Sequence, residues 1–378
     1  MELYLDGAST TPVDENVKKL YADLLERSFA STGSLHKNGE EALLVETNAR
    51  NEIAALLKVN PTEIYFNSGA TEGNNYAIKG VAFQYKNRGK TIITTKVEHP
   101  SVLECVEQLQ KDYGFNAIYL DVDENGVVDL NQLKNSLSND VILLSVMYVN
   151  HEVGSIMPIK EIRKLISSYP KIIFHSDITQ AIGKTPVDFS LIDIATMSSH
   201  KIHGLKGCGF MYVKNKVTLY PLFNGHPARN ALRAGTSNWI SNATTALALK
   251  NALLNLTKNK QKLIESRDLL ISKLSQIDKV IINTNPNVSI ANIINFSISG
   301  YNPEVVIRAL SSKGIYVSSK SACSVSKKSQ ISATLKAMKK ADDLCISSIR
   351  VSLIRPLERE EIDYFLDSLK QVLSIIRR

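Results

Sequence analysis

Short apolar runs alternate with amphipathic stretches between residues 60 and 215 of this 378-residue chain, and this alternation constrains the fold most strongly. The runs expected to be strands are residues 91–95, 117–120, 141–148, 171–174, 193–197 and 209–213. Between two of them, Ile159, Ile162 and Ile166 recur at the spacing of one helical face. Strands that are apolar on both faces and alternate with helices form mostly parallel sheets covered on both sides. The pattern therefore predicts an α/β fold.

The last third of the chain has a different pattern. Leucines share one face of a long helix expected from Leu256 to Ile277, with no strand pattern nearby. Shorter elements are expected after it: a strand at 290–298, a helix at 303–312, a strand at 314–318 and a final helix after Pro356. We therefore predict a large domain of residues 15–255 and a smaller α+β domain of residues 1–14 and 256–378.

Composition narrows the class of protein. The hydrophobic fraction of 44% and charged fraction of 22% are ordinary for a globular chain. No apolar run approaches the roughly 20 residues that span a bilayer, and the N-terminus lacks the features of a signal peptide. A cytoplasmic location is therefore expected. The net charge of +8 would suit an acidic partner such as RNA. However, no basic stripe interleaved with aromatic residues supports nucleic-acid binding.

The four cysteines, Cys105, Cys208, Cys323 and Cys345, form no C-x-x-C pair. A metal site built from this chain alone is therefore not expected, and the thiols should be free in a cytoplasmic protein. Cys105 falls in a helical pattern, and the neighbours of Cys208 and Cys345 are small or apolar, so all three fit buried structural roles. Cys323 instead lies in the Ser- and Lys-rich stretch 318–332, which is expected to be a mobile surface loop.

Reactive side chains follow four of the predicted strands. They are His99, then Asn150 and His151, then Asp177, and finally the run Ser198-Ser199-His200-Lys201. Ligands of open parallel sheets bind beyond the carboxyl ends of the strands, so these side chains are expected to share one site. Each alone would more often be structural, but their joint placement predicts an active site.

A candidate phosphate site comes earlier in the chain. Ser68-Gly69-Ala70-Thr71-Glu72-Gly73 follows a short apolar run and opens a helix expected at residues 72–84. Free backbone N–H groups and the helix dipole favour an anion at such a position. The motif is neither a Walker A nor a G-x-G-x-x-G sequence, and many helices begin this way, so alone it is a weak signal.

Asp177 and Lys201 together indicate a pyridoxal 5'-phosphate (PLP) enzyme. That chemistry needs a lysine amine for the Schiff base and a carboxylate beside the pyridine nitrogen. The carboxylate keeps the nitrogen protonated, so the ring can accept electrons. Asp177-x-x-Gln180, followed one strand later by Ser198-x-His200-Lys201, is far more specific than a lone aspartate or lysine.

At this point the chain resembles a known family, the cysteine desulfurases of the NifS/IscS type within the class V (fold type I) PLP aminotransferases. The matching segments occur in the family's order over nearly the whole chain: residues 4–11, 68–72, 98–99, 175–180, 198–201, 233–236, 321–323 and 348–350. The resemblance implies a mostly parallel seven-stranded sheet in the large domain and a smaller α+β domain.

The resemblance also implies how PLP would be held. Lys201 would bind it covalently, Asp177 would pair with the pyridine nitrogen, and Gln180 would contact the phenolic oxygen. The residues implied at the phosphate are Ala70, Thr71, Ser198 and His200. Thr236 would reach the phosphate of the neighbouring subunit, which implies a homodimer with shared sites.

The remaining implied roles concern L-cysteine, the substrate. His99 would stack on the cofactor ring and move protons, Arg350 would clamp the substrate carboxylate, and Asn150 would help to bind the substrate. After Lys201 removes the Cα proton, the thiolate of Cys323 would attack the substrate sulfur, giving a persulfide and L-alanine. The sulfur would then pass to an iron–sulfur scaffold or a tRNA-thiolation enzyme.

The sequence departs from the family pattern at residues 29–34, where a glycine–asparagine–proline turn is usual, and at two further positions. His151 stands where an asparagine near the phenolic oxygen is usual, and Lys320 replaces the glycine before Ser321-Ala322-Cys323. Two alternatives remain open. Another class V lyase or transaminase, such as a selenocysteine lyase, would keep Lys201 without needing a mobile cysteine. A non-catalytic scaffold for sulfur transfer would need neither Lys201 nor a mobile cysteine.

Overall fold

The computed structural model describes residues 1–225, 232–319 and 331–376. Its main feature is a seven-stranded sheet in the order β2-β8-β7-β6-β5-β3-β4. The strands are β2 (Ile64–Asn67), β3 (Thr91–Thr95), β4 (Asn116–Leu120), β5 (Val141–Ser145), β6 (Ile173–Asp177), β7 (Ile194–Ser198) and β8 (Gly209–Val213). β8 runs antiparallel to both of its neighbours, and the other pairs are parallel. The predicted α/β fold with a mostly parallel sheet is therefore confirmed.

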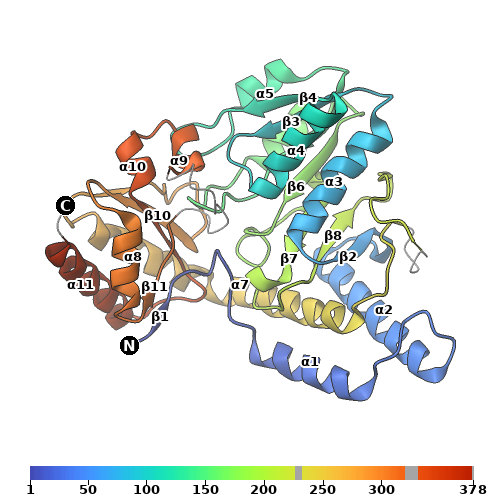
Figure 1. Ribbon diagram of the computed structural model, residues 1–378, viewed down its shortest axis with the longest axis horizontal. Coiled ribbons are helices and arrows are strands. Elements are labelled where there is room, and N and C mark those ends of the chain that lie inside the picture. The colour runs from blue at the N-terminus through green and yellow to red at the C-terminus, as the bar shows by residue number, and fades with distance from the viewer. Residues whose placement is uncertain (226–231, 320–330, 377–378) are drawn as a thin grey trace.

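Helices cover both faces of this sheet (Figure 1). They include α1 (Glu15–Arg27), α2 (Lys37–Leu57), α3 (Ala70–Tyr85), α4 (Pro100–Tyr113), α5 (Leu130–Ser136) and α6 (Ile159–Ile166), with short 3-10 helices at Pro61–Glu63, Phe189–Leu191 and Ser199–Lys201. α3 and α4 pack on one face, and α2 and α6 pack on the other. The central strands are consequently buried on both faces, which explains their continuous apolar runs.

A second group of elements surrounds its own core. An antiparallel sheet has the order β12-β10-β9, and β1 pairs in parallel with β11. The elements are β1 (Leu3–Tyr4), β9 (Val280–Ile282), β10 (Ile293–Ile298), β11 (Ile315–Tyr316), β12 (Ser348–Ser352), α8 (Pro303–Ser311), α9 (Ala333–Ala337), α10 (Asp342–Ile346) and α11 (Arg359–Ile375). Side chains of β1, β10, β12, α8 and α11 fill this core.

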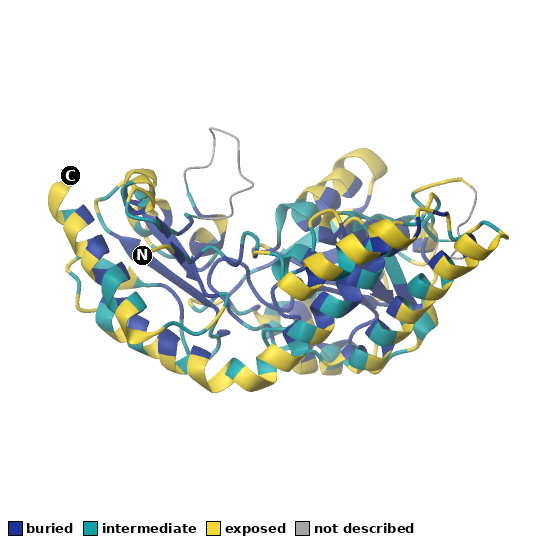
Figure 2. Cartoon of the chain, turned by 90° about the horizontal axis from the view of Figure 1, so that it is seen from below, coloured by how far each residue is buried: buried dark blue, intermediate teal, exposed yellow. Residues whose placement is uncertain are grey.

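The long helix α7 (Trp239–Leu274) joins the two cores. Its first half packs against α2 and the large sheet, and its second half packs into the smaller core. Figure 2 shows the buried residues gathered in these two bodies, with exposed helix faces outside. The expected domain boundaries remain a prediction. Among the helices of the described ranges, none combines the length and apolar character needed to cross a bilayer.

Candidate active site

Most of the predicted site residues line one pocket of about 220 Å³ beyond the carboxyl ends of the parallel strands. The lining includes Ala70, Thr71, His99, His151, Asp177, Gln180, Ser198, His200, Lys201 and Arg350. The side chains at the strand ends and those implied by the family resemblance therefore make up most of the pocket lining. Cys323 and its neighbour Lys320 lie outside the described residues.

Lys201 reaches the pocket from the turn that follows β7. Its Nζ donates hydrogen bonds to the carbonyl oxygens of Ala8 and Ser9, at 2.6 and 2.5 Å. Both carbonyls belong to the N-terminal segment after β1, nearly two hundred positions away along the chain. The N-terminal segment therefore closes one side of the pocket and holds the lysine amine in place.

Asp177 ends β6 and is held as a hydrogen-bond acceptor. Its Oδ2 accepts from Nδ2 of Asn74 at 2.8 Å, and its Oδ1 accepts from the backbone N–H of Thr179 at 2.9 Å. Oδ1 of Asn74 in turn accepts from Thr196. Asn74 was not predicted as a site residue. The only signal for it is its position one helical turn after Ala70 in α3.

The N-terminus of α3 opens on the same pocket. Gly69 is its N-cap, with φ of 134°, and as a glycine it has no side chain to cap the helix. Ser198 Oγ accepts from the backbone N–H of Ala70 at 2.8 Å, which ties the first turn of α3 to the end of β7. Nδ1 of His200 lies 3.0 Å from Oγ1 of Thr10. This helix terminus offers positive dipole and backbone donors to an anion, as the sequence predicts.

Two histidine rings lie together in the pocket. His99 is the N-cap of α4, and its Nδ1 accepts from the backbone N–H of Ser101 at 3.2 Å, so the proton of the neutral ring is on Nε2. The rings of His99 and His151 are 5.6 Å apart at an angle of 71°. Burial lowers the pKa of His99 and holds that of His151 well below its usual value. Both rings are therefore uncharged at neutral pH.

Arg350 comes from β12 and is only 2% exposed. Its Nη1 donates to the carbonyl of His151 at 2.8 Å, and its Nη2 donates to Ser9 Oγ at 2.8 Å and to Asp6 at 3.1 Å. These contacts fix the guanidinium at the pocket wall. Asp6 and Ser9 were not predicted to support it, although both belong to the N-terminal segment that matches the family.

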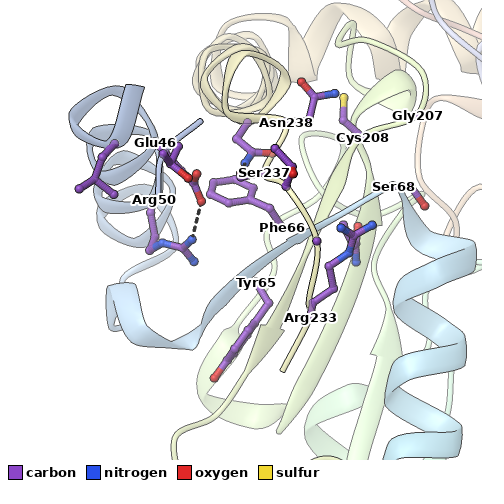
Figure 3. A pocket seen from close by; sticks show the side chains of 16 residues that line it. Glu46, Arg50, Tyr65, Phe66, Ser68, Gly207, Cys208, Arg233, Ser237 and Asn238 are labelled. Atoms are coloured by element: carbon purple, nitrogen blue, oxygen red, sulfur yellow. Dashed lines mark hydrogen bonds and ion pairs between the residues drawn. The ribbon is translucent and has the colours of Figure 1, made fainter. Parts of the chain in front are cut away.

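Two predicted residues do not line this pocket. Asn150 is fully buried, and its Oδ1 accepts from the backbone N–H groups of Glu152 and Val153, so its contacts shape a turn and give no support to a substrate role. Thr236 is exposed and lines a separate pocket of about 260 Å³. Figure 3 shows Arg233 in that pocket, close to the strand that carries Tyr65 and Phe66.

The other three cysteines have the environments expected of structural residues. Cys105, Cys208 and Cys345 are buried, at 4%, 2% and 1% exposure. Burial raises the pKa of all three thiols, that of Cys105 to about 12. None of them lines the pocket of Lys201.

Three polar atoms on residues that line the pocket are buried without a hydrogen-bond partner in the described part of the chain: His151 Nδ1, Thr179 Oγ1 and Arg350 Nε. Buried polar atoms are normally paired, so these atoms indicate that the pocket takes a polar ligand. An amine, a carboxylate and a helix N-terminus face it as well. This set of donors and acceptors fits PLP. No group of three or more potential metal ligands occurs in the described ranges.

The fold and the pocket are those of an α/β enzyme that could bind PLP, and comparison with known proteins identifies its family. The chain belongs to the aminotransferase class-V family, whose model matches residues 3–365. It is 38% identical to Cysteine desulfurase IscS of Dictyoglomus turgidum, over 100% of this chain and 95% of that one. A solved structure described as a NifS-like protein matches with a TM-score of 0.94 and 33% identity over 100% of both chains. A structure of SspA in complex with cysteine matches with a TM-score of 0.82 and 28% identity. The match covers 95% of this chain and 100% of that one. Within the family, these likenesses place the chain among the cysteine desulfurases of the NifS/IscS type.

Proposed function

We propose that this cysteine desulfurase uses PLP held by Lys201 and transfers the sulfur of L-cysteine through Cys323. The observation that carries the proposal is the meeting of Lys201, Asp177 and Arg350 at one pocket. An amine, an anionic acceptor and a cationic fork are the three groups needed to attach PLP, protonate its ring nitrogen and bind an amino acid carboxylate.

The pocket residues have distinct roles toward the cofactor. Lys201 would supply the amine, and Asp177 would pair with the ring nitrogen. The phosphate would lie at the N-terminus of α3 with Ser198 and His200, and Gln180 and His151 would lie at the phenolic oxygen. When bound, PLP supplies the electron sink that stabilises negative charge on the substrate Cα.

The chain's own side chains then handle the substrate and its protons. Arg350 binds the substrate carboxylate, and Lys201 takes the Cα proton with His99 beside it. The Cβ–S bond of the substrate breaks as its sulfur bonds to the Cys323 thiolate, the electron pair of the broken bond stays with Cβ, and Cβ takes a proton before alanine leaves. Burial and a raised pKa make Cys105, Cys208 and Cys345 poor nucleophiles, which supports Cys323 as the sulfur acceptor.

We also propose a homodimer in which Thr236 completes the partner's phosphate site. Thr236 is exposed and outside the pocket of its own Lys201. Phe29 and Leu35 are 94% and 97% exposed, and such apolar side chains favour burial against a second copy. From Cys323, the sulfur would pass to an acceptor protein, either an iron–sulfur scaffold or a tRNA-thiolation enzyme.

The decisive experiment measures both halves of the proposal on the purified protein. The visible absorption of bound PLP is recorded, and alanine and sulfide are assayed from L-cysteine with a reductant. Cys323→Ser should keep the absorption band and lose sulfide release, because the band depends on Lys201. Cys105→Ala is the matched control and should keep both.

Two outcomes would contradict this proposal. Sulfide release by Cys323→Ser at the wild-type rate would show that no persulfide forms on Cys323, and would favour a lyase of the selenocysteine type. A wild-type protein that takes up no PLP would instead favour a non-catalytic scaffold.

A further inference from the structure

Lys184 is a second lysine near the pocket, and the mechanism above does not use it. It follows the turn after β6, where Gly183 has φ of 73° and packs so closely on α7 that an added Cβ would lie 2.7 Å from that of Ala252. This turn brings Lys184 Nζ to 2.6 Å from Gln180 Oε1. Lys184 also lines a pocket of about 220 Å³ that shares Lys201 with the reaction pocket.

The hydrogen bond from Lys184 decides which way the Gln180 amide faces. Gln180 Nε2 donates to the carbonyl of Ala8 at 2.9 Å, while its Oε1 accepts from Lys184. If the amide flipped, its NH₂ group would face the donor on Lys184 and its oxygen would face the Ala8 carbonyl. Both new contacts would be repulsive, so the two partners select one orientation.

One of these two partners, the Ala8 carbonyl, is shared with the reacting lysine, and the other is not. The Ala8 carbonyl also accepts from Lys201 Nζ at 2.6 Å. Lys201 must change its bonding when it attaches to the cofactor and again when it takes a proton, so its hydrogen bond to Ala8 cannot persist throughout. Lys184 forms no bond to a reacting atom, and it therefore provides the fixed end for Gln180.

Lys184 is a largely buried lysine with two other cationic side chains near it. Burial, followed by the charges of Lys201 and Arg350, lowers the pKa of Lys184 to about 7. The residue keeps some exposure through the second pocket, but burial is still the largest cause. The other titratable or charged groups lining that pocket are His203, Asp14 and Arg355. The charged amine has no lone pair, so it can only donate to Gln180 Oε1 and excludes the flipped amide, while the Ala8 carbonyl, which only accepts, excludes it in either protonation state of Lys184.

We propose that Lys184 is a positioning residue that holds the Gln180 amide so that its NH₂ group faces the phenolic oxygen of the cofactor. The inference rests on the proposed use of PLP and deepens it. Lys184 touches neither substrate nor cofactor in this account and acts through Gln180 alone.

The test follows the pH midpoint at which the visible band of bound PLP changes as the proton shared by its phenolic oxygen and the Lys201 nitrogen is gained or lost. Losing an oriented N–H donor to this anionic oxygen should raise the midpoint of Lys184→Met by about one pH unit. Lys184→Arg keeps a donor and should restore the wild-type midpoint. Lys250→Met removes a lysine paired with Glu52 at the surface and is the matched control that should shift nothing.

A double-mutant cycle separates positioning from simple loss of charge. If Lys184 acts through Gln180, Lys184→Met should cause no further shift in a Gln180→Ala background. If Lys184→Met does not fold, Lys184→Gln, whose shorter side chain cannot reach Gln180, takes its place. An unchanged midpoint in the single variant, or a shift that persists without Gln180, overturns the inference. A wild-type protein that shows no PLP band overturns the proposed cofactor, and this inference with it.

Discussion

At the scale of residues, the pocket brings Lys201 and Arg350 together with three histidines that remain neutral mainly because they are buried. Burial and the nearby lysines lower the pKa of His200 to about 4, and burial is also the main cause of the lowered pKa of His99 and His151. Uncharged rings can donate or accept hydrogen bonds without adding repulsion to Lys201. The positive charge of the pocket therefore lies on Lys201 and Arg350 and not on its histidines.

His99 makes this argument testable through pH. Its pKa lies below the ordinary value of 6.5, so the neutral ring persists to lower pH than in a free histidine. If neutral His99 is the working form, kcat/KM should stay level as pH falls from 7.5 to about 6.5 and decline only below that. Profiles of the wild type and His99→Gln check this. An acid limb centred at or above about 6.5 that disappears in His99→Gln would contradict the assignment.

The expectation that ligands bind at strand ends identifies side chains that directly follow strands. It does not identify the distant residues that form hydrogen bonds to the pocket side chains. Asn74 contacts Asp177 across 103 positions, and Ser9 contacts Arg350 across 341, so no local pattern reports either pair. Asn150 is the opposite case, a polar residue after a strand whose side chain bonds its own turn, and its substrate role stays a prediction.

At the scale of elements, the contact between the end of β7 and the start of α3 shapes the part of the pocket that can bind an anion. Gly69 has φ of 134° and ψ of −178°, a backbone conformation that only glycine adopts readily. A Cβ there would lie 3.0 Å from Ser198 Oγ, the atom that holds the first turn of α3. The glycine thus keeps backbone donors close to both the helix start and the strand end.

Gly69→Ala should accordingly damage stability and cofactor binding together. The expected loss of unfolding free energy is about 2–3 kcal/mol, and PLP affinity should fall about tenfold if the first turn of α3 shifts. Gly114→Ala is the control, because Gly114 has φ of 68° at the end of α4 with open space around it. It should cost about 1 kcal/mol and leave PLP affinity unchanged. Urea unfolding and PLP titration measure both quantities, and equal affinity in the two variants would contradict the prediction.

Sequence periodicity predicts the buried strands well because the sheet is covered on both faces. β3 at Thr91–Thr95 and β8 at Gly209–Val213 have the predicted bounds, whereas β5 ends at Ser145, three residues before the predicted end. The start of α7 is the larger miss, since it begins at Trp239 and not at Leu256. Its first half packs through small and polar residues such as Ser241 and Thr245, which carry no apolar stripe for the sequence to show.

At the scale of the whole molecule, the pocket lies where the two cores meet. Leu3 and Leu5 pack in the smaller core, and Ala8 packs in the larger one, so the N-terminal segment crosses between them beside Lys201. Arg350 enters from the smaller body and Asp177 from the larger. These pocket residues are therefore fixed relative to each other only when both bodies are folded and in contact.

Within one chain, Thr236 lies outside the pocket of Lys201. If Thr236 completes the site of a partner subunit, two inactive variants should restore activity to each other in a mixed dimer. Lys201→Ala and Thr236→Ala proteins should each be impaired as homodimers. In a mixed dimer, one site carries both substitutions and the other carries neither. After unfolding and refolding together, random pairing should restore about a quarter of wild-type sulfide release, because half of the dimers are mixed and half of their sites are intact. Each variant refolded alone is the control. A mixture no more active than the average of the two controls would show that Thr236 does not serve a partner's site.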